Sequence, residues 1–219
     1  MDSFISADLL FRWAHVLFGI TWIGLLYYFN FVQTEYFKEA EASAKADAMQ
    51  KLAPRALWWF RWGAMFTFIT GLVLLAGIRN MHGIDGYIVM GALMGTFMFL
   101  NVWLIIWPNQ QIVIGLKEGD KPSAAAKAGL ASRTNTLFSA PMLLGMMGSF
   151  HGSGSASTIV DSAAGGGSVT TGLIAVLVIT LALEANAIFG KMGPMASVKG
   201  VVHCSIALAV VCLALLQLL

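Results

Sequence analysis

Four histidines are the side chains of this sequence best suited to chemistry: His15, His82, His151 and His203. His15 falls inside a long apolar stretch, where an ionisable residue is by default a functional candidate. An imidazole can ligate a haem iron or another metal, and it can also carry a proton. The histidines are therefore the starting point for predicting a site.

Two neighbours of His15 on the same helical face would suit a haem. Arg12 precedes it by three residues and Gly19 follows it by four, and residues at this spacing share a face. His15 would bind the iron, Arg12 would pair with a propionate, and the porphyrin would lie over Gly19. The alternative is a histidine that bonds a neighbouring helix, with Gly19 serving only close packing. Spacing alone leaves both open.

A second axial ligand would have to come from another helix. His151 closes the fourth predicted helix and is expected at the membrane level of His15, so this pair is preferred for bis-histidine ligation of a b-type haem. His82 is expected near the same level, but it lies next to Gly83 in a short polar turn. We therefore interpret His82 as a solvated loop histidine.

Glu184 and His203 form a separate candidate pair in the fifth and sixth predicted helices. Their expected depths in the membrane match within one helical turn, and a buried glutamate needs a partner, which His203 or Lys199 could supply. The pair could be purely structural. It could also serve a proton path, or an inner ligand site in which Glu184 orients His203.

The amino-acid composition indicates the kind of fold that holds these residues in place. The 219 residues are 58% hydrophobic and only 11% charged, and the mean hydropathy is +0.77, whereas a soluble domain carries about 25% charged residues. A water-soluble globular domain is excluded. A net charge of only +2 without a basic tract argues against a nucleic-acid partner. The sequence predicts an all-α, polytopic helix bundle in a lipid bilayer, with residues 1–219 forming one transmembrane domain.

About six stretches are long and apolar enough to span a membrane, which takes roughly 20 residues. Residues 35–55 predict an amphipathic continuation of the first helix, residues 117–133 look similar but contain Pro122, and residues 152–168 predict a flexible loop. The predicted spans are residues 8–32, 56–78, 86–107, 134–151, 170–190 and 199–219.

The distribution of basic residues predicts an orientation. Eleven of the 13 lysines and arginines fall in the first, third and fifth loops or the adjoining helix ends, and only Arg12 and Arg79 fall on the other side. The positive-inside rule then places those three loops in the cytoplasm. Both termini are therefore expected to be periplasmic, in a bacterial inner membrane.

Three separated blocks of sequence resemble the membrane domain of the bacterial membrane-bound urate oxidase (urate hydroxylase) family. The resemblance covers about residues 8–151 and is weaker beyond them. The blocks are RWAHVLFGITWIG at residues 12–24, GTFMFLNVWLIIWPNQ at 95–110, and SRTNTLFSAPML at 132–143 followed by His151.

The resemblance implies a membrane domain that oxidises urate toward 5-hydroxyisourate and passes electrons through a cytochrome c to the respiratory chain. His15 and His151 carry over by position, which implies haem b at that pair. Val89 and Thr134 stand where further histidines are expected, and the sequence holds no C-x-x-C-H motif for a covalent c-type haem. Electrons are therefore expected to leave through a separate cytochrome c.

Two hypotheses follow. The chain is either a haem-b redox protein, which oxidises urate or relays electrons, or a cofactor-free accessory subunit that packs against a larger membrane complex. A visible spectrum of the purified protein separates the two, because only the first predicts a Soret band that shifts on reduction.

Overall fold

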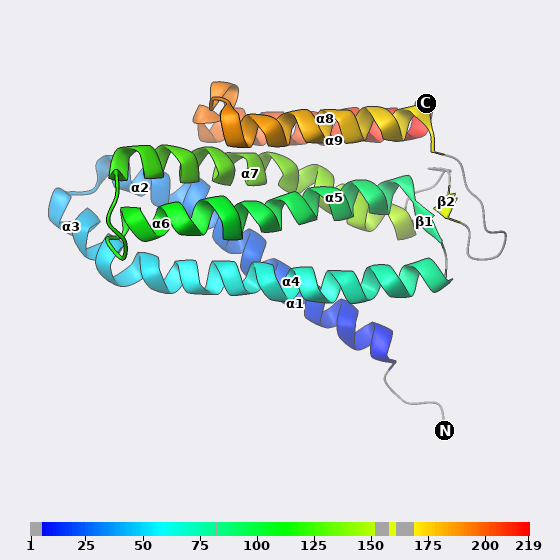
Figure 1. Ribbon diagram of the computed structural model, residues 1–219, viewed down its shortest axis with the longest axis horizontal. Coiled ribbons are helices and arrows are strands. Elements are labelled where there is room, and N and C mark those ends of the chain that lie inside the picture. The colour runs from blue at the N-terminus through cyan, green and yellow to red at the C-terminus, as the bar shows by residue number, and fades with distance from the viewer. Residues whose placement is uncertain (1–5, 82, 152–157, 161–168) are drawn as a thin grey trace.

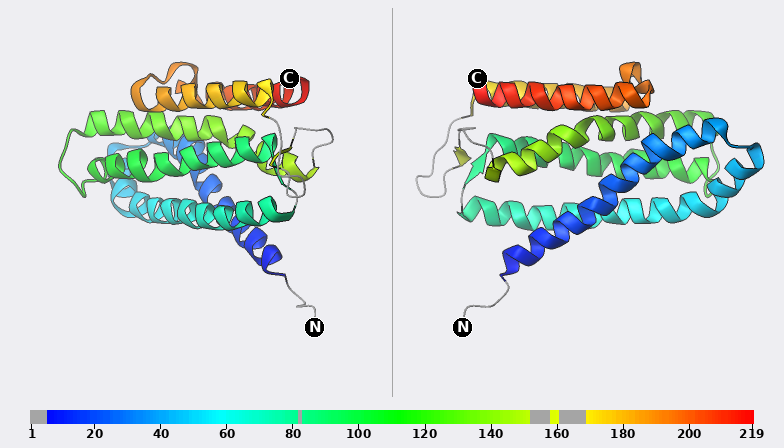
Figure 2. Two further views of the ribbon diagram at one scale, coloured as in Figure 1. Left: turned by 45° about the vertical axis from the view of Figure 1, so that its right-hand side comes forward. Right: turned by 180° about the vertical axis from the view of Figure 1, so that it is seen from behind.

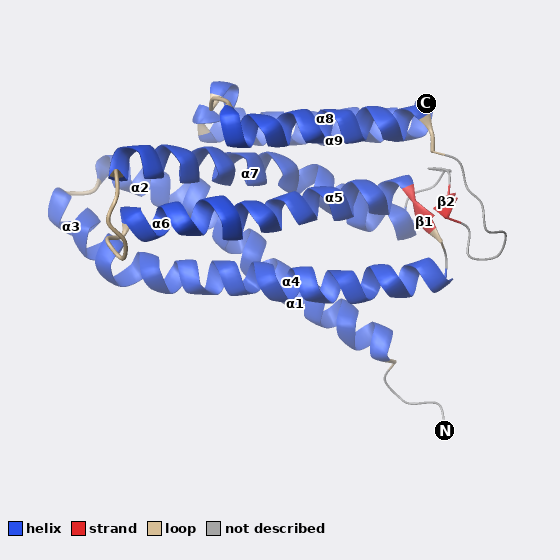
Figure 3. Ribbon diagram, in the orientation of Figure 1, coloured by secondary structure: helices blue, strands red, loops and turns tan. Residues whose placement is uncertain are grey.

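The computed structural model describes residues 6–81, 83–151, 158–160 and 169–219. These residues are almost entirely helical, and long helices run side by side in one bundle (Figures 1 and 3). The first residues of α1 and the last of α9 lie at the same end of the bundle (Figure 1). An even number of crossings explains this arrangement.

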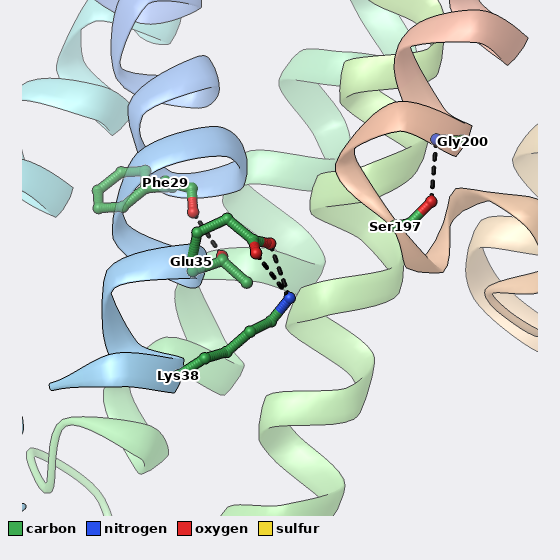
Figure 4. Close-up of polar contacts among 6 residues, drawn as sticks. Phe29, Glu35, Lys38, Ser197 and Gly200 are labelled. Carbon is green, nitrogen blue, oxygen red and sulfur yellow. Dashed lines mark hydrogen bonds and ion pairs between the residues drawn. The ribbon is translucent and has the colours of Figure 1, made fainter.

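The first helix is long and crosses the others at a steep angle (Figure 2). It consists of α1 (Ala7–Tyr27), a π-helical stretch η1 (Tyr28–Gln33) and α2 (Thr34–Glu39). Ser6 caps its start, since its hydroxyl accepts a hydrogen bond from the amide of Leu9. Near its other end, Lys38 pairs with Glu35 (Figure 4).

The chain returns through α3 (Ala42–Asp47), η2 (Ala48–Leu52) and the 29-residue α4 (Ala53–Met81). Helical structure across residues 35–55 is confirmed, with one interruption at Ala40, whose backbone is extended. The interruption lets the chain reverse direction at this end of the bundle.

The next two helices are joined at the same end of the bundle by a short loop. One consists of α5 (Gly86–Leu100), π-helical η3 (Asn101–Ile106) and α6 (Trp107–Val113), and the other is α7 (Lys121–His151). The prediction that the fourth helix begins near residue 134 is wrong. The structure starts it at Lys121, because Pro122 occupies the first turn, where its missing N–H costs no hydrogen bond.

The last two helices, α8 (Thr171–Phe189) and α9 (Val198–Leu218), form a pair along one side of α7 (Figure 1). They are joined by a 3₁₀ turn, η4 (Gly193–Ala196). Ser197 caps α9 by accepting from the amide of Gly200 (Figure 4).

Residues 152–168, predicted to form a flexible loop, lie mostly outside the described residues. The part described is β2 (Thr158–Val160), which pairs antiparallel with β1 (Ile84–Asp85). This short pairing lies at the end of the bundle where α4 turns into α5 (Figure 3).

Five helices of the described chain are long and apolar enough to cross a membrane, so the prediction of a multi-pass all-α bundle is confirmed. Helix α7 is not among them, because it carries more polar residues. Arg133 is 5% exposed, and Thr134 and Asn135 are fully buried. Helix α7 packs against α5, α6, α8 and α9, which shield these polar side chains from lipid.

A proline inside α7 is compensated by a neighbouring helix. Pro141 has no N–H for the carbonyl of Leu137, one turn earlier. The hydroxyl of Ser205 on α9 lies 2.9 Å from that carbonyl oxygen and 3.1 Å from the carbonyl of Thr136. Within a membrane such a donor is needed, because no water is at hand to bond the freed carbonyl.

Candidate functional site

His15 lies at the contact between α1 and α4. Its Nδ1 lies 2.9 Å from the carbonyl oxygen of Thr67 and 3.1 Å from the hydroxyl of Thr70. A carbonyl only accepts, so Nδ1 must carry the proton. In the neutral ring the lone pair is then on Nε2, for which no hydrogen bond is seen within the described part of the chain.

Gly71 gives the His15 ring its space. A Cβ atom at Gly71 would lie 3.0 Å from Cε1 of His15, which is tighter than ordinary contacts. Thr67, Thr70 and Gly71 are spaced three and four apart, so they present one face of α4 to the histidine. Sequence analysis missed these three residues, although two threonines and a glycine at that spacing in an apolar helix were a usable signal.

The two expected companions of His15 have other contacts as well. Arg12 donates from Nε to the carboxylate of Asp8 at 2.6 Å. Gly19 faces α4, since a Cβ there would lie 4.0 Å from the methyl group of Thr67. The space beside Gly19, where the porphyrin was expected, is thus bordered by Thr67.

Two of the other three histidines, His151 and His203, lie among the described residues. His151 is the last residue of α7 and is exposed. His82 lies outside the described residues. The end of α7 packs against α5, where a Cβ at Gly148 would touch the ring of Tyr87. Among the described contacts none joins His15 to His151, although their helices, α1 and α7, touch elsewhere, where the hydroxyls of Tyr27 and Ser139 lie 2.8 Å apart.

A second polar site lies inside the bundle, where η3, α7 and α8 meet. Asn101 donates from its amide nitrogen to Asn135 Oδ1 at 3.0 Å and to Glu184 Oε2 at 3.1 Å. Asn135 donates in turn to the carbonyl of Met98 at 2.9 Å. The exposed fractions are 1% for Asn101, 0% for Asn135 and 8% for Glu184. We call Asn101, Asn135 and Glu184 the amide–carboxylate cluster.

The expected partner of Glu184 is therefore corrected. Its hydrogen bond comes from Asn101, whereas His203 is exposed on α9 and makes no described contact with Glu184. The depths of the two residues along their helices were matched, but depth says nothing about rotation about the helix axis. Rotation turns Glu184 inward and His203 outward.

Asn101 and Asn135 were not singled out from the sequence. Asn101 is a lone amide in an apolar stretch, whereas Asn135 lies in the polar run SRTNT at residues 132–136. A polar side chain inside a membrane must find a partner. Asn101 also begins the π-helical stretch η3, and such turns are frequent at functional sites. These amides were a signal, but their contact with Glu184 depends on tertiary packing.

Long apolar helices packed around buried polar residues define a multi-pass membrane helix bundle. Within it, residues 79–163 match the family model described as urate oxidase N-terminal. This segment, which includes Asn101, Asn135 and His151, is therefore urate-oxidase-like. His15 and Glu184 lie outside the matched segment. Neither a curated protein nor a solved structure matches the chain.

Proposed function

We propose that this chain is a haem-b-binding redox protein of urate-oxidase type, with His15 as a ligand of the iron. The observation that carries the proposal is the hydrogen bond from His15 Nδ1 to the carbonyl of Thr67. Metal-ligating histidines usually donate their second ring nitrogen in this way, which fixes the tautomer and increases the basicity of the ligating nitrogen.

The residues around His15 fit an axial ligand. Gly71 accommodates the ring and Thr70 adds a second polar contact at Nδ1, so the plane of the imidazole is held from one side. Arg12 would be shared between Asp8 and a haem propionate. When bound, the haem would supply one-electron chemistry.

His151 is the proposed second axial ligand. Its exposed position at the end of α7 leaves its ring accessible, and its place inside the matched segment supports a role in the family's site. For the pair to act together, α7 and α1 would have to present both rings to one porphyrin.

The proposed reaction is oxidation of urate, or relay of electrons from it, with a separate cytochrome c as the electron acceptor. The family match supports the class of substrate, and the apolar helices support action at a membrane. A bacterial inner membrane with periplasmic termini is the proposed location, because basic residues concentrate in the loops at the opposite end.

The test is a reduced-minus-oxidised visible spectrum of the protein purified in detergent. Haem b bound by two histidines predicts a Soret band that shifts on addition of dithionite, together with sharp bands of a low-spin ferrous haem. A protein without a Soret band, even after expression with added haem precursor, would contradict the proposal.

A cofactor-free accessory subunit is the second candidate, and one observation favours it. The N-terminal half of α1 exposes many large apolar side chains, which could meet helices of a larger complex as well as lipid. In this case the bonds of His15 to α4 would serve packing alone. The exposed side chains include Leu9, Leu10, Trp13, Val16, Leu17 and Ile20.

A further inference from the structure

Glu184 is a buried acid for which the proposed haem chemistry has no use. We propose that Glu184 is a proton-binding site in the interior of the membrane, held in place by Asn101 and Asn135. It takes one proton from water, which converts its carboxylate to a carboxylic acid, and returns that proton to water. This inference is independent of the haem proposal.

Among the described residues no cation lies within ion-pair distance of Glu184. The three ion pairs among the described residues lie elsewhere, in α1, α2 and around η2. A carboxylate taken out of water without a cationic partner is strongly unfavourable. Binding a proton removes that charge and the cost.

The helices that pack against α8 carry few titratable groups. On α7 the titratable residue nearest in sequence to Asn135 is Arg133, which lies within electrostatic reach of Glu35. On α9 His203 and Lys199 are exposed. On α5 the titratable group is Tyr87, at the far end, where Gln217 donates to its hydroxyl.

The hydrogen bonds of the amide–carboxylate cluster leave it short of a donor. Asn101 uses both hydrogens of its amide, on Asn135 and on Glu184. Its own oxygen, Oδ1, is fully buried and has no hydrogen-bond partner among the described residues. A buried acceptor without a donor is unfavourable. A proton on Glu184 supplies this cluster with an additional O–H donor.

The same arrangement argues against a metal ion as the occupant. Asn135 Oδ1 and Glu184 Oε2 already accept N–H hydrogens from Asn101, so these oxygens are turned toward a donor. The described residues also hold no group of three or more histidine, cysteine, aspartate or glutamate side chains that could bind a metal. A monovalent cation is left as an outcome of the test.

The proton has a short way to water. Helix α8 ends at Phe189, five residues beyond Glu184, which is about 8 Å at 1.5 Å per residue. Gly190 and Lys191, which follow directly, are exposed. Exchange is therefore expected with the side of the membrane where α8 ends and α9 begins.

Infrared spectroscopy of the full chain in lipid bilayers at neutral pH tests the assignment. A protonated carboxyl group gives a C=O stretching band that is separate from the carboxylate bands and shifts in D₂O. We expect this band in the unmodified protein and expect it to vanish in Glu184→Gln. The control, Glu39→Gln, removes an exposed acid of α2 and should keep the band.

A second variant covers the case in which Glu184→Gln fails to fold. Asn101→Ser should keep the acid but shift the frequency of its band, because the hydrogen bonds to it change. No protonated-acid band in the unmodified protein, or a band that persists in folded Glu184→Gln, would overturn the proposal. A band that appears only when sodium and potassium are removed would also overturn it and would assign the site to a cation.

Discussion

At the scale of single residues, His15 gains its candidate role from what it touches. Its Nδ1 is held by a main-chain carbonyl that no side-chain substitution removes, whereas Thr70 and Gly71 shape the rest of its pocket. The tautomer is therefore fixed by the backbone of α4. Side chains of α4 decide whether the ring can keep its position.

Replacement of Gly71 by valine is expected to displace the His15 ring. A Cβ at Gly71 already comes within 3.0 Å of Cε1, and overpacking of this kind costs about 1–3 kcal/mol. Thermal unfolding in detergent should show a lower Tm for Gly71→Val. The matched control is Gly77→Val on the same helix, where a Cβ would meet nothing within 4 Å, and an equal loss in both variants would contradict the packing.

Replacement of Asn101 by alanine is expected to destabilise the bundle. It leaves Asn135 Oδ1 and Glu184 Oε2 without their donor, and each buried group left unsatisfied costs about 1–3 kcal/mol. The free energy of unfolding should fall more than in Asn109→Ala, whose side chain, among the described residues, bonds the carbonyl of Ile105 one turn earlier. Equal losses of unfolding free energy in the two variants would show that the hydrogen bonds of the amide–carboxylate cluster add no stability beyond that of a local side-chain bond.

At the scale of elements, α7 is the helix that organises the interior. It is not among the helices whose length and composition suit a membrane span, yet its central polar residues, from Arg133 to Thr136, are buried among the other helices. Glycines let it approach closely, since a Cβ at Gly145 would lie 2.6 Å from the carbonyl of Tyr87 on α5. Its proline is tolerated because Ser205 bonds the freed carbonyl.

The pairing of Pro141 with Ser205 can be tested by a double-mutant cycle. Ser205→Ala alone should lower the free energy of unfolding by about 1 kcal/mol, because the carbonyl of Leu137 loses its donor. In Pro141→Ala the new N–H can bond that carbonyl, so Ser205→Ala should cost less in this background. Additive effects would mean that the two residues act independently.

The sequence was sufficient to predict where the helices lie along the chain. It was not sufficient to predict which face of each helix turns toward its neighbours. Apolar runs of about 20 residues set the number and approximate bounds of the helices, and the fourth span was placed too late because residues 117–133 are polar. The contacts of Glu184 and His15 depend on which face each helix turns inward. That choice follows from packing between helices far apart in the chain, such as α1 with α4, and the sequence alone does not contain it.

At the scale of the whole molecule, the two candidate sites are separate polar clusters in a bundle with a largely apolar core. One is the His15 contact between α1 and α4, and the other is the amide–carboxylate cluster where η3, α7 and α8 meet. They are built on different helices. An electron-transfer role at the first and a proton-binding role at the second can therefore be removed one at a time by mutation.

The orientation of the bundle gives a further prediction. The starts of α1 and α5 and the ends of α4 and α9 lie at one end (Figure 1), and most basic residues lie in the loops at the other. A reporter enzyme that works only in the periplasm should be active when it is fused to either the N-terminus or the C-terminus. A C-terminal reporter active only in the cytoplasm would contradict this orientation.

Haem content of a histidine variant tests the central claim most directly. The ratio of haem b to protein should fall to near zero in His15→Ala, because the ligand held by Thr67 is lost. It should be unchanged in His203→Ala, whose side chain is exposed on α9. Full haem content in folded His15→Ala would contradict the assignment of His15 as the ligand of the iron.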